Sequence, residues 1–212
     1  MKFEIKRRFT GAVKFTTEIE APEDAPASVK MRLAVLGAIE NKVDLSRSDL
    51  RGSNLSDCDL SDCDLSGSDL SGSDLIGCDL RGCDLSGSDL SDCDLSDCDL
   101  SDCDLSDCDL SGSDLSGCDL SGSYLSGSDL SGSDLRDCDL RGSDLRGSDL
   151  RVLQTDIWTV YVQKNTIRIG CQYHSISDWA QFTDGQIANM HGSALIWWKI
   201  WKDIIFAIHA TI

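Results

Sequence analysis

The sequence predicts a mainly β protein whose central half is a solenoid of five-residue units. Leu recurs at every fifth position from Leu45 to Leu150, 22 times without a gap. Asp precedes this Leu in all but two units, and Ser or Cys stands two positions before it in all but one. A period of five fits neither a 3.6-residue helix nor a two-residue strand. It fits a chain that turns a corner after each unit, so that four units close a square coil.

Each position of the unit has an expected place in this coil. The Leu and the small residue two before it point inward, whereas the Asp and the two remaining residues point outward. Gly at the corner, as in Gly52 or Gly67, allows the tight turn. A disordered chain has no reason to keep the Leu register, and the apolar segments at both ends match the caps that a solenoid needs. The repeats therefore predict a folded rod.

These units resemble the pentapeptide-repeat family, whose consensus is A-[D/N]-L-x-x, and the flanks look similar to those of its phage and bacterial members. The resemblance implies a right-handed quadrilateral β-helix, here of about 5.5 coils over residues 43–150. Stacking at strand spacing predicts a rod roughly 26 Å long. The sequence departs from the family in one respect, because Ser or Cys replaces the usual Ala almost everywhere.

The N-terminal segment, residues 1–42, predicts a ββα cap over the first coil. Lys2–Arg8 and Ala12–Glu20 alternate apolar and polar residues around a Thr-Gly pair, which is typical of a β-hairpin. Ala27–Glu40 has helical spacing, and Asn41 suits its end. The apolar positions that define its expected buried face are Val29, Leu33, Leu36 and Ile39.

The C-terminal segment, residues 151–212, predicts a mixed cap of strands and helices. Strands are expected over residues 156–163 and 166–172, and a short helix is expected to begin at Ser177 or Asp178. An amphipathic helix should follow over residues 193–210, and it leaves an oligomer through this helix possible. Charged residues interrupt it, so we expect no membrane span. Its expected buried face is Ala194, Trp197, Trp198, Trp201, Ile204, Ile205 and Ile208.

The cysteines predict a reducing, cytoplasmic environment. Eleven Cys occur in a chain that begins without a signal-like apolar stretch, which favours free thiols over a disulfide framework. Four of them share one coil: Cys93, Cys98, Cys103 and Cys108. A square coil holds its walls apart with Leu between them, too far for zinc ligands. We therefore expect these thiols to act as small inward fillers, without a metal or other cofactor.

The C-terminal segment offers a second, weaker set of chemical groups: Cys171, His174, His191 and His209. The Cys171–His174 spacing alone is a poor metal signature, because no second cysteine pair accompanies it. The same two residues form a nominal nucleophile and base, yet nothing nearby supplies an orienting group or an oxyanion hole. We therefore predict that the protein is not an enzyme.

Acidic charge is the strongest functional signal. Residues 43–150 hold 27 Asp and six Arg, whereas the two flanks are slightly positive. Over the predicted rod this is one net negative charge per ~1.2 Å, compared with one per ~1.7 Å in duplex DNA. Such a surface should repel nucleic acid and anionic membranes and attract basic proteins or cations.

The charge concentrates in one coil, residues 91–110, within a stretch from Cys83 to Leu135 that has no Lys or Arg. Asp before Leu is ordinary in the repeats and explains 20 of the 27 Asp. The other seven occupy the turn position, where Gly would serve, and four of these are in this coil. The predicted interaction surface is Asp92, Asp94, Asp97, Asp99, Asp102, Asp104, Asp107 and Asp109.

Three functions are compatible with this pattern. The first is a structural or protein-interaction scaffold of unknown partner, which needs only the fold. The second is an acidic mimic of DNA that binds a DNA-handling enzyme such as gyrase. The family resemblance implies this possibility, although the sequence lacks the loop insertions and Phe-rich core of the quinolone-resistance members. The third is weak binding of divalent cations by the Asp ladders, whose spacing matches no EF-hand.

Overall fold

A computed structural model describes all residues, 1–212, and the chain folds into two compact units. The first unit is Met1–Ser148 and the second is Asp149–Ile212. The first contains β1 (Lys2–Arg7), β2 (Val13–Glu18), α1 (Ala27–Glu40) and β3 (Ser48–Asp49), followed by the repeats. The second contains β4 (Arg151–Gln154), β5 (Thr159–Val162), β6 (Thr166–Ile169), β7 (Gln172–Ser175), α2 (Ile176–Gln181), α3 (Asp184–Met190) and α4 (Ala194–His209).

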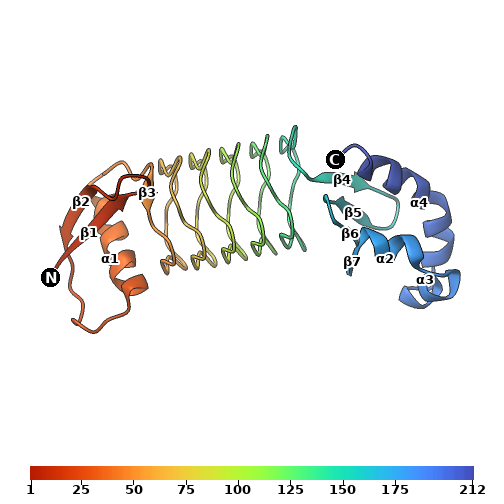
Figure 1. The fold of residues 1–212 in the computed structure, drawn as a ribbon, viewed down its shortest axis with the longest axis horizontal. Helices are drawn as coiled ribbons and strands as arrows, with labels where there is room; N and C mark the ends of the chain where they lie inside the picture. The colour runs from red at the N-terminus through yellow and green to blue at the C-terminus, as the bar shows by residue number, and fades with distance from the viewer. The chain divides into compact units, whose positions relative to one another are not determined.

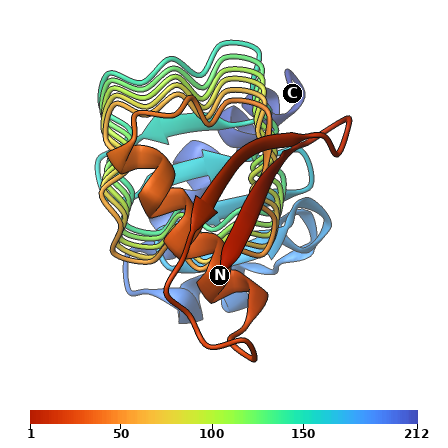
Figure 2. The same ribbon diagram turned by 90° about the vertical axis from the view of Figure 1, so that its left-hand side faces the viewer.

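The repeats form a β-helix in which the residue before each Leu pairs with the residue twenty positions later. Parallel bridges join Asp94 to Asp74 before it and to Asp114 after it, and the same step recurs along the rod. The Leu95 N–H donates to the Asp114 carbonyl at 2.8 Å, and the Asp94 N–H donates to the Ser73 carbonyl at 3.0 Å. Each coil therefore satisfies the backbone groups of its neighbours, as strands do in a sheet. Figure 1 shows the coils stacked, and Figure 2 shows them superposed as nested squares.

Leucine and the small residue line the inside of the coils, as predicted. The repeat Leu side chains are buried, apart from Leu140 and Leu145, which are half-buried because no further repeat stacks on that coil. Ser and Cys at the small position do more than fill space, because from Ser68 to Ser128 each donates a hydrogen bond to a Leu carbonyl one coil earlier. The Cys98 thiol donates to Leu75 at 2.9 Å, and the Ser88 hydroxyl donates to Leu65 at 2.8 Å. This shared role explains why the two residues interchange along the rod.

The turn position adopts a left-handed backbone conformation. Thirteen Gly at this position have positive φ, and so do the seven turn Asp, with φ between +55° and +59°. Gly takes this conformation without steric cost, whereas a residue with a Cβ does not. Asp is among the side chains best tolerated there, because it is short and polar.

The turn Asp and Gly residues follow a rule along each column of the rod. Six turn Asp have a repeat stacked on them, and the residue twenty positions later is always Gly. The reason is steric: a Cβ placed on Gly112 would lie 2.6 Å from Asp92 Oδ1, and one on Gly82 would lie 2.7 Å from Asp62 Oδ1. Each turn Asp leans over the next coil, where only Gly leaves room.

The N-terminal hairpin joins the first coil through backbone pairing. β1 pairs with β2 on one side and with β3 on the other, through Lys6–Asp49 and Arg7–Ser48. The Arg8 guanidinium reaches further along the rod, donating to the Ser68 carbonyl and to Asp89 Oδ2, both at 3.1 Å. In Figure 2 the hairpin and α1 lie across the end of the nested coils.

Helix α1 has the bounds expected from the sequence, Ala27–Glu40, but Leu33, Leu36 and Ile39 of its expected buried face are only half-buried. Its buried residues are Ala34, Val35 and Ala38, whereas Val29 is exposed. The small side chains let the helix approach β2 closely: a Cβ on Gly37 would lie 3.2 Å from the Thr17 hydroxyl oxygen. Close approach selected the small-residue face over the face with the larger apolar residues.

The C-terminal unit contains an antiparallel sheet with the order β4-β5-β6-β7. The strand expected over residues 166–172 begins at Thr166 as predicted but ends at Ile169, because Gly170, with φ +55°, ends β6 and turns the chain into β7. Strand β4 lies before the first strand that the sequence predicted. Gly170 is also required sterically, since a Cβ there would lie 2.8 Å from Trp158 Cδ1.

Three helices complete this unit. α2 begins at Ile176, one or two residues earlier than expected, because the Ser175 hydroxyl accepts the Asp178 N–H and caps the helix. α3 was not expected, although Thr183 and Gln186 form a capping box at its start. α4 begins and ends close to its predicted bounds, but Ile204 on its expected buried face is exposed. None of the helices has the length and unbroken apolarity needed to cross a bilayer.

The column rule predicts that Ala is tolerated differently at two glycines of one column. Gly112→Ala and Gly132→Ala both place a Cβ at positive φ, at a cost of about 1–2 kcal/mol in the free energy of unfolding. Only Gly112 lies over a turn Asp, since a Cβ at Gly132 meets nothing closer than the Gly112 backbone at 3.9 Å. Gly112→Ala should therefore cost about 0.5–1.5 kcal/mol more, because Asp92 must leave its rotamer. Urea unfolding of both variants measures the difference.

The matched test is a double-mutant cycle. Asp92→Gly combined with Gly112→Ala should recover the additional loss, so that the pair costs no more than Gly132→Ala. Additive effects of Asp92→Gly and Gly112→Ala would show that the side chain of Asp92 does not restrict the residue above it.

Candidate functional site

The structure divides the eight Asp of the acidic coil, residues 91–110, into two kinds. Those at the turn position are exposed and have φ between +55° and +59°. They are Asp92, Asp97, Asp102 and Asp107, and we call them the turn aspartates. No hydrogen bond or ion pair to their carboxylates is present in the structure, so their charge is directed to solvent.

The four Asp that precede Leu have a structural task. Asp94 Oδ1 accepts the Ser96 N–H at 3.1 Å and the Ser96 hydroxyl at 2.7 Å. The same pair of bonds recurs at Asp99, Asp104 and Asp109, each with the Ser two residues later. One carboxylate oxygen is therefore committed to holding the turn. The sequence grouped these residues with the turn aspartates, and the geometry separates them.

Cations neutralise the two ends of the repeat section and leave this coil almost bare. Arg141 forms an ion pair with Asp139, and Arg146 forms one with Asp144; in each pair the two residues are two positions apart in the sequence. The hydrogen bond from the Arg141 side chain lowers the pKa of Asp139 below its usual value. Within the acidic coil only Asp99 lies near a cation, at 3.6 Å from Arg81 Nε.

The four cysteines of the acidic coil are buried behind its acidic surface. Their thiols donate to the carbonyl groups of Leu70, Leu75, Leu80 and Leu85, at 2.8–3.0 Å. Burial raises the pKa of Cys93, Cys103 and Cys108 to about 12, from an ordinary 9.0. The structure holds no group of three or more His, Cys, Asp or Glu side chains placed to bind one metal ion.

The candidate residues of the C-terminal segment are placed in separate surroundings. The His174 ring packs edge-on against Trp179 and Phe182, with centroids 5.3 and 4.9 Å away. His209 Nε2 lies 3.0 Å from the Lys164 carbonyl oxygen. Cys171 is exposed and, together with His191, lines a cavity. The nominal Cys171–His174 pair therefore has a histidine held in an aromatic cluster.

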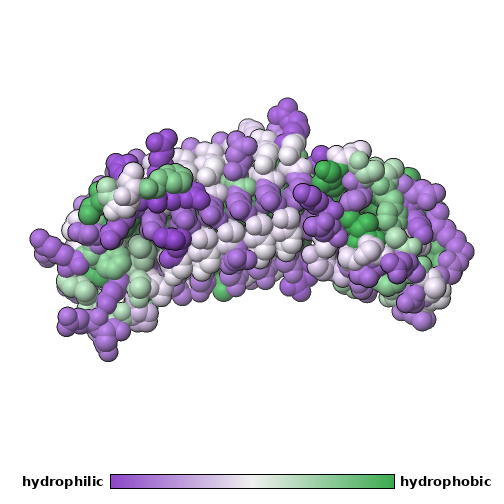
Figure 3. Space-filling model, viewed as in Figure 1, coloured by the Kyte–Doolittle hydropathy of each residue, from purple (hydrophilic) through white to green (hydrophobic).

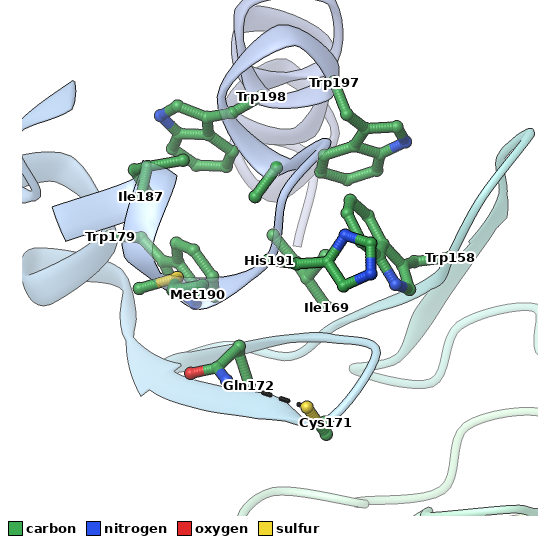
Figure 4. Close-up of a pocket in the computed structure, with 11 residues that line it drawn as sticks. Trp158, Ile169, Cys171, Gln172, Trp179, Ile187, Met190, His191, Trp197 and Trp198 are labelled. Carbon is green, nitrogen blue, oxygen red and sulfur yellow. Dashed lines mark hydrogen bonds between the residues drawn. The ribbon is translucent and has the colours of Figure 1, made fainter. Parts of the chain in front are cut away.

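Sequence reasoning missed this cavity, which lies entirely within the C-terminal unit. Its volume is about 80 Å³, and its walls include Trp158, Trp179, Trp197 and Trp198 (Figure 4), together with Ala194 of α4. The sequence showed many Trp and predicted that they were buried. It could not show that a small residue on α4 leaves space among them.

The fold and the repeat together define a β-helical solenoid built from five-residue units. A family model described as pentapeptide repeats matches in eight copies, over residues 44–82, 73–112 and 113–151. These matches span half of the chain, and the chain belongs to this family. Among curated proteins, none matches the chain.

Several solved structures are similar to part of the chain. A pentapeptide repeat protein, Rfr23, from the cyanobacterium Cyanothece 51142 is 31% identical over 43% of this chain and 60% of its own, with a TM-score of 0.41. HetL, a pentapeptide repeat protein involved in heterocyst differentiation regulation in Nostoc sp. strain PCC 7120, is 31% identical over 50% of this chain and 52% of its own, with a TM-score of 0.38. A trypsin-treated form of QnrB1, a plasmid-mediated fluoroquinolone resistance protein, is 25% identical over 50% of this chain and 74% of its own, with a TM-score of 0.24.

The buried thiols predict that the protein loses stability in mild alkali. Their pKa is raised in the folded state, so the unfolded chain releases thiol protons above about pH 9 while the folded chain retains them to about pH 12. The stabilisation that these protonated thiols contribute to the free energy of unfolding is complete below about pH 9 and is lost as the pH rises towards 12. Between pH 8 and pH 10 we expect a loss of about 1 kcal/mol per thiol in the free energy of unfolding.

The control is the triple variant Cys93→Ser, Cys103→Ser and Cys108→Ser, which keeps the inward hydrogen-bond donors. Urea unfolding of both proteins under reductant, at pH 8 and at pH 10, measures the difference in slope. The parent should lose more stability than the variant over this interval. Equal losses would mean that these thiols ionise as readily in the folded state as in the unfolded chain.

Proposed function

We propose that this protein is a non-catalytic protein-interaction scaffold whose binding surface is the acidic coil. A stack of coils that share backbone hydrogen bonds is a rigid support, and solenoids present extended surfaces of this kind to their partners. On the face shown in Figure 3, the repeat section presents mostly hydrophilic and near-neutral residues, and more apolar colour lies on the N-terminal and C-terminal segments. The partner is therefore expected to be polar and basic.

The observation that carries this proposal is the backbone conformation of the turn aspartates. Gly occupies this position in most repeats and adopts positive φ freely, whereas four successive turns of one coil hold Asp at φ of +55° to +59°. These four carboxylates also lie in one coil, where they repel one another. Asp at these positions is unfavourable both for the backbone conformation and for the repulsion between like charges. Residues that are unfavourable in this way are expected at functional positions.

A second candidate is that the partner is a DNA-handling enzyme, such as gyrase, for which the rod imitates a DNA duplex. The charge density of the repeats, comparable to that of DNA, favours this candidate. The stretch from Cys83 to Leu135 contains no Lys or Arg that would interrupt the negative field. A field of this kind increases association rates with a basic groove and makes binding sensitive to salt.

Weak divalent-cation binding is a further alternative with less support. Pairs such as Asp92 and Asp94 offer carboxylate oxygens of the kind that Ca²⁺ prefers. However, Asp94 Oδ1 already accepts two hydrogen bonds from Ser96. A cation would have to compete with that turn or bind through the remaining oxygens alone.

We further propose that residues 1–42 and 151–212 act as caps of the right-handed coils and that the protein works in the cytoplasm. Pairing of β1 with the first coil supports the role of the N-terminal cap. An oligomer formed through α4 is consistent with its exposed Ile196, Ile200 and Ile204, which are 72%, 61% and 45% exposed. Eleven free thiols agree with a reducing compartment.

The test changes the four turn aspartates to Gly, which reduces the net charge from −18 to −14. The variant should fold with unchanged or greater stability, because Gly relieves four positive-φ Asp. Its affinity for a basic partner should fall by about tenfold or more at low salt, since each charge contributes a few tenths of a kcal/mol. Affinity for gyrase, and inhibition of its supercoiling activity, are the first measurements.

The matched control removes the same number of charges elsewhere, through Glu18→Gln, Glu20→Gln, Glu23→Gln and Asp24→Asn, all exposed in the N-terminal segment. It should bind like the parent. If the parent does not bind gyrase at low salt, the DNA-mimic candidate is wrong. If partners captured from the host bind parent, control and quadruple variant equally, the acidic coil is not the binding surface.

A further inference from the structure

The cavity of the C-terminal unit lies between two groups of aromatic rings. On one side Trp158 packs edge-on against Trp197, with ring centroids 5.0 Å apart, and against His191 at 5.4 Å. On the other side Trp179 packs against Trp198 at 5.1 Å. Ala194 of α4 also lines the cavity, and Figure 4 shows the space between the two groups of rings.

Two of the four lining indoles have their N–H groups engaged elsewhere. The Trp179 indole N–H donates to the Ile167 carbonyl at 2.8 Å, and that of Trp197 donates to the Thr155 hydroxyl at 3.0 Å. Polar groups of the lining are few, and two of them are neighbours at one edge: the Gln172 amide and the Cys171 thiol, which are 3.6 Å apart. The cavity is therefore an apolar chamber with a polar rim.

We propose that this cavity binds a small neutral ring, aromatic or alicyclic, with one polar substituent directed towards Gln172. A volume of about 80 Å³ is roughly half of the ~150 Å³ of an engineered apolar cavity that binds benzene, so one small ring fits only with its substituted edge in the opening beside the exposed Cys171. Aromatic pairs prefer edge-to-face or offset packing, and a ring inserted beside Ala194 continues the arrangement already formed by Trp158 and Trp197. The site is independent of the acidic coil and of its proposed partner.

A cation is a poorer match, although clustered indoles are known to bind quaternary ammonium groups. No Asp or Glu lines the cavity. A cation that lost its water there would have no counter-charge, and burial of an uncompensated charge is costly. The chemistry of the walls thus selects a neutral ligand.

The test uses phenol as the probe and the indole N–H signals of the intact, ¹⁵N-labelled protein as the readout. All five Trp lie in the C-terminal unit, and four of them line the cavity. Phenol should shift the signals of these four, saturating in about the millimolar range expected for a ligand of so few atoms. Ala194→Leu fills the cavity and should weaken binding at least tenfold. Ala207→Leu, the same change at an exposed position of α4, should leave it unaltered.

Chemical labelling gives a second measurement of phenol binding that does not require the Ala194→Leu variant. Cys171 is the only exposed thiol of the eleven, so iodoacetamide should modify it first. Phenol should slow this modification severalfold in the parent. Gln172→Leu should reduce the preference of the site for phenol over toluene, because the polar rim loses its amide.

The results separate the proposal from its alternatives. Loss of phenol binding in Ala194→Leu, with retention in Ala207→Leu, supports it. Equal shifts in both variants would place the probe elsewhere and overturn it. Tighter binding of tetramethylammonium than of phenol would also overturn it, in favour of a cation site. If neither probe shifts the indole signals nor protects Cys171, the space is a packing defect and the proposal is wrong.

Discussion

The twenty-residue backbone register is the constraint on which the first unit depends. From Leu50 to Leu125 each repeat Leu N–H donates to the carbonyl nineteen positions later, and from Asp69 to Asp144 each residue before Leu donates to the small residue twenty-one positions earlier. These bonds fix which side chains stack, so they determine the Leu layers, the inward Ser and Cys donors and the columns of turns. The charge and shape of the surface are then determined by the residues that occupy each outward column.

The sequence predicted the parts of the fold that follow from a period. Unbroken Leu spacing determined the coils, and alternation with a Thr-Gly turn located the hairpin. Features that depend on close approach were not predictable, because they are decided by neighbours distant in the sequence. The buried face of α1 is set by Gly37 against Thr17, and the division of β6 from β7 is set by Gly170 beneath Trp158.

The sequence located the candidate acidic coil, but it did not distinguish the roles of the individual carboxylates. Counting Asp identified the coil of residues 91–110, yet all eight carboxylates look alike in a list of charges. Only the structure shows that Asp94 and its equivalents hold Ser residues, whereas the turn aspartates accept no bond. The cavity beside Ala194 was outside the reach of sequence reasoning, because a helical pattern shows which residues are buried and not how completely they fill the space.

The four-sided coil also limits how such a gene can change in length. Gain or loss of four consecutive repeats leaves every later residue on its original face, and the columns stay in phase. Gain or loss of a single repeat rotates everything beyond it by a quarter turn, so that contacts such as that of Arg8 with Asp89 would meet a different face. Related proteins that keep a functional face are therefore expected to differ in length by whole coils, that is, by multiples of twenty residues.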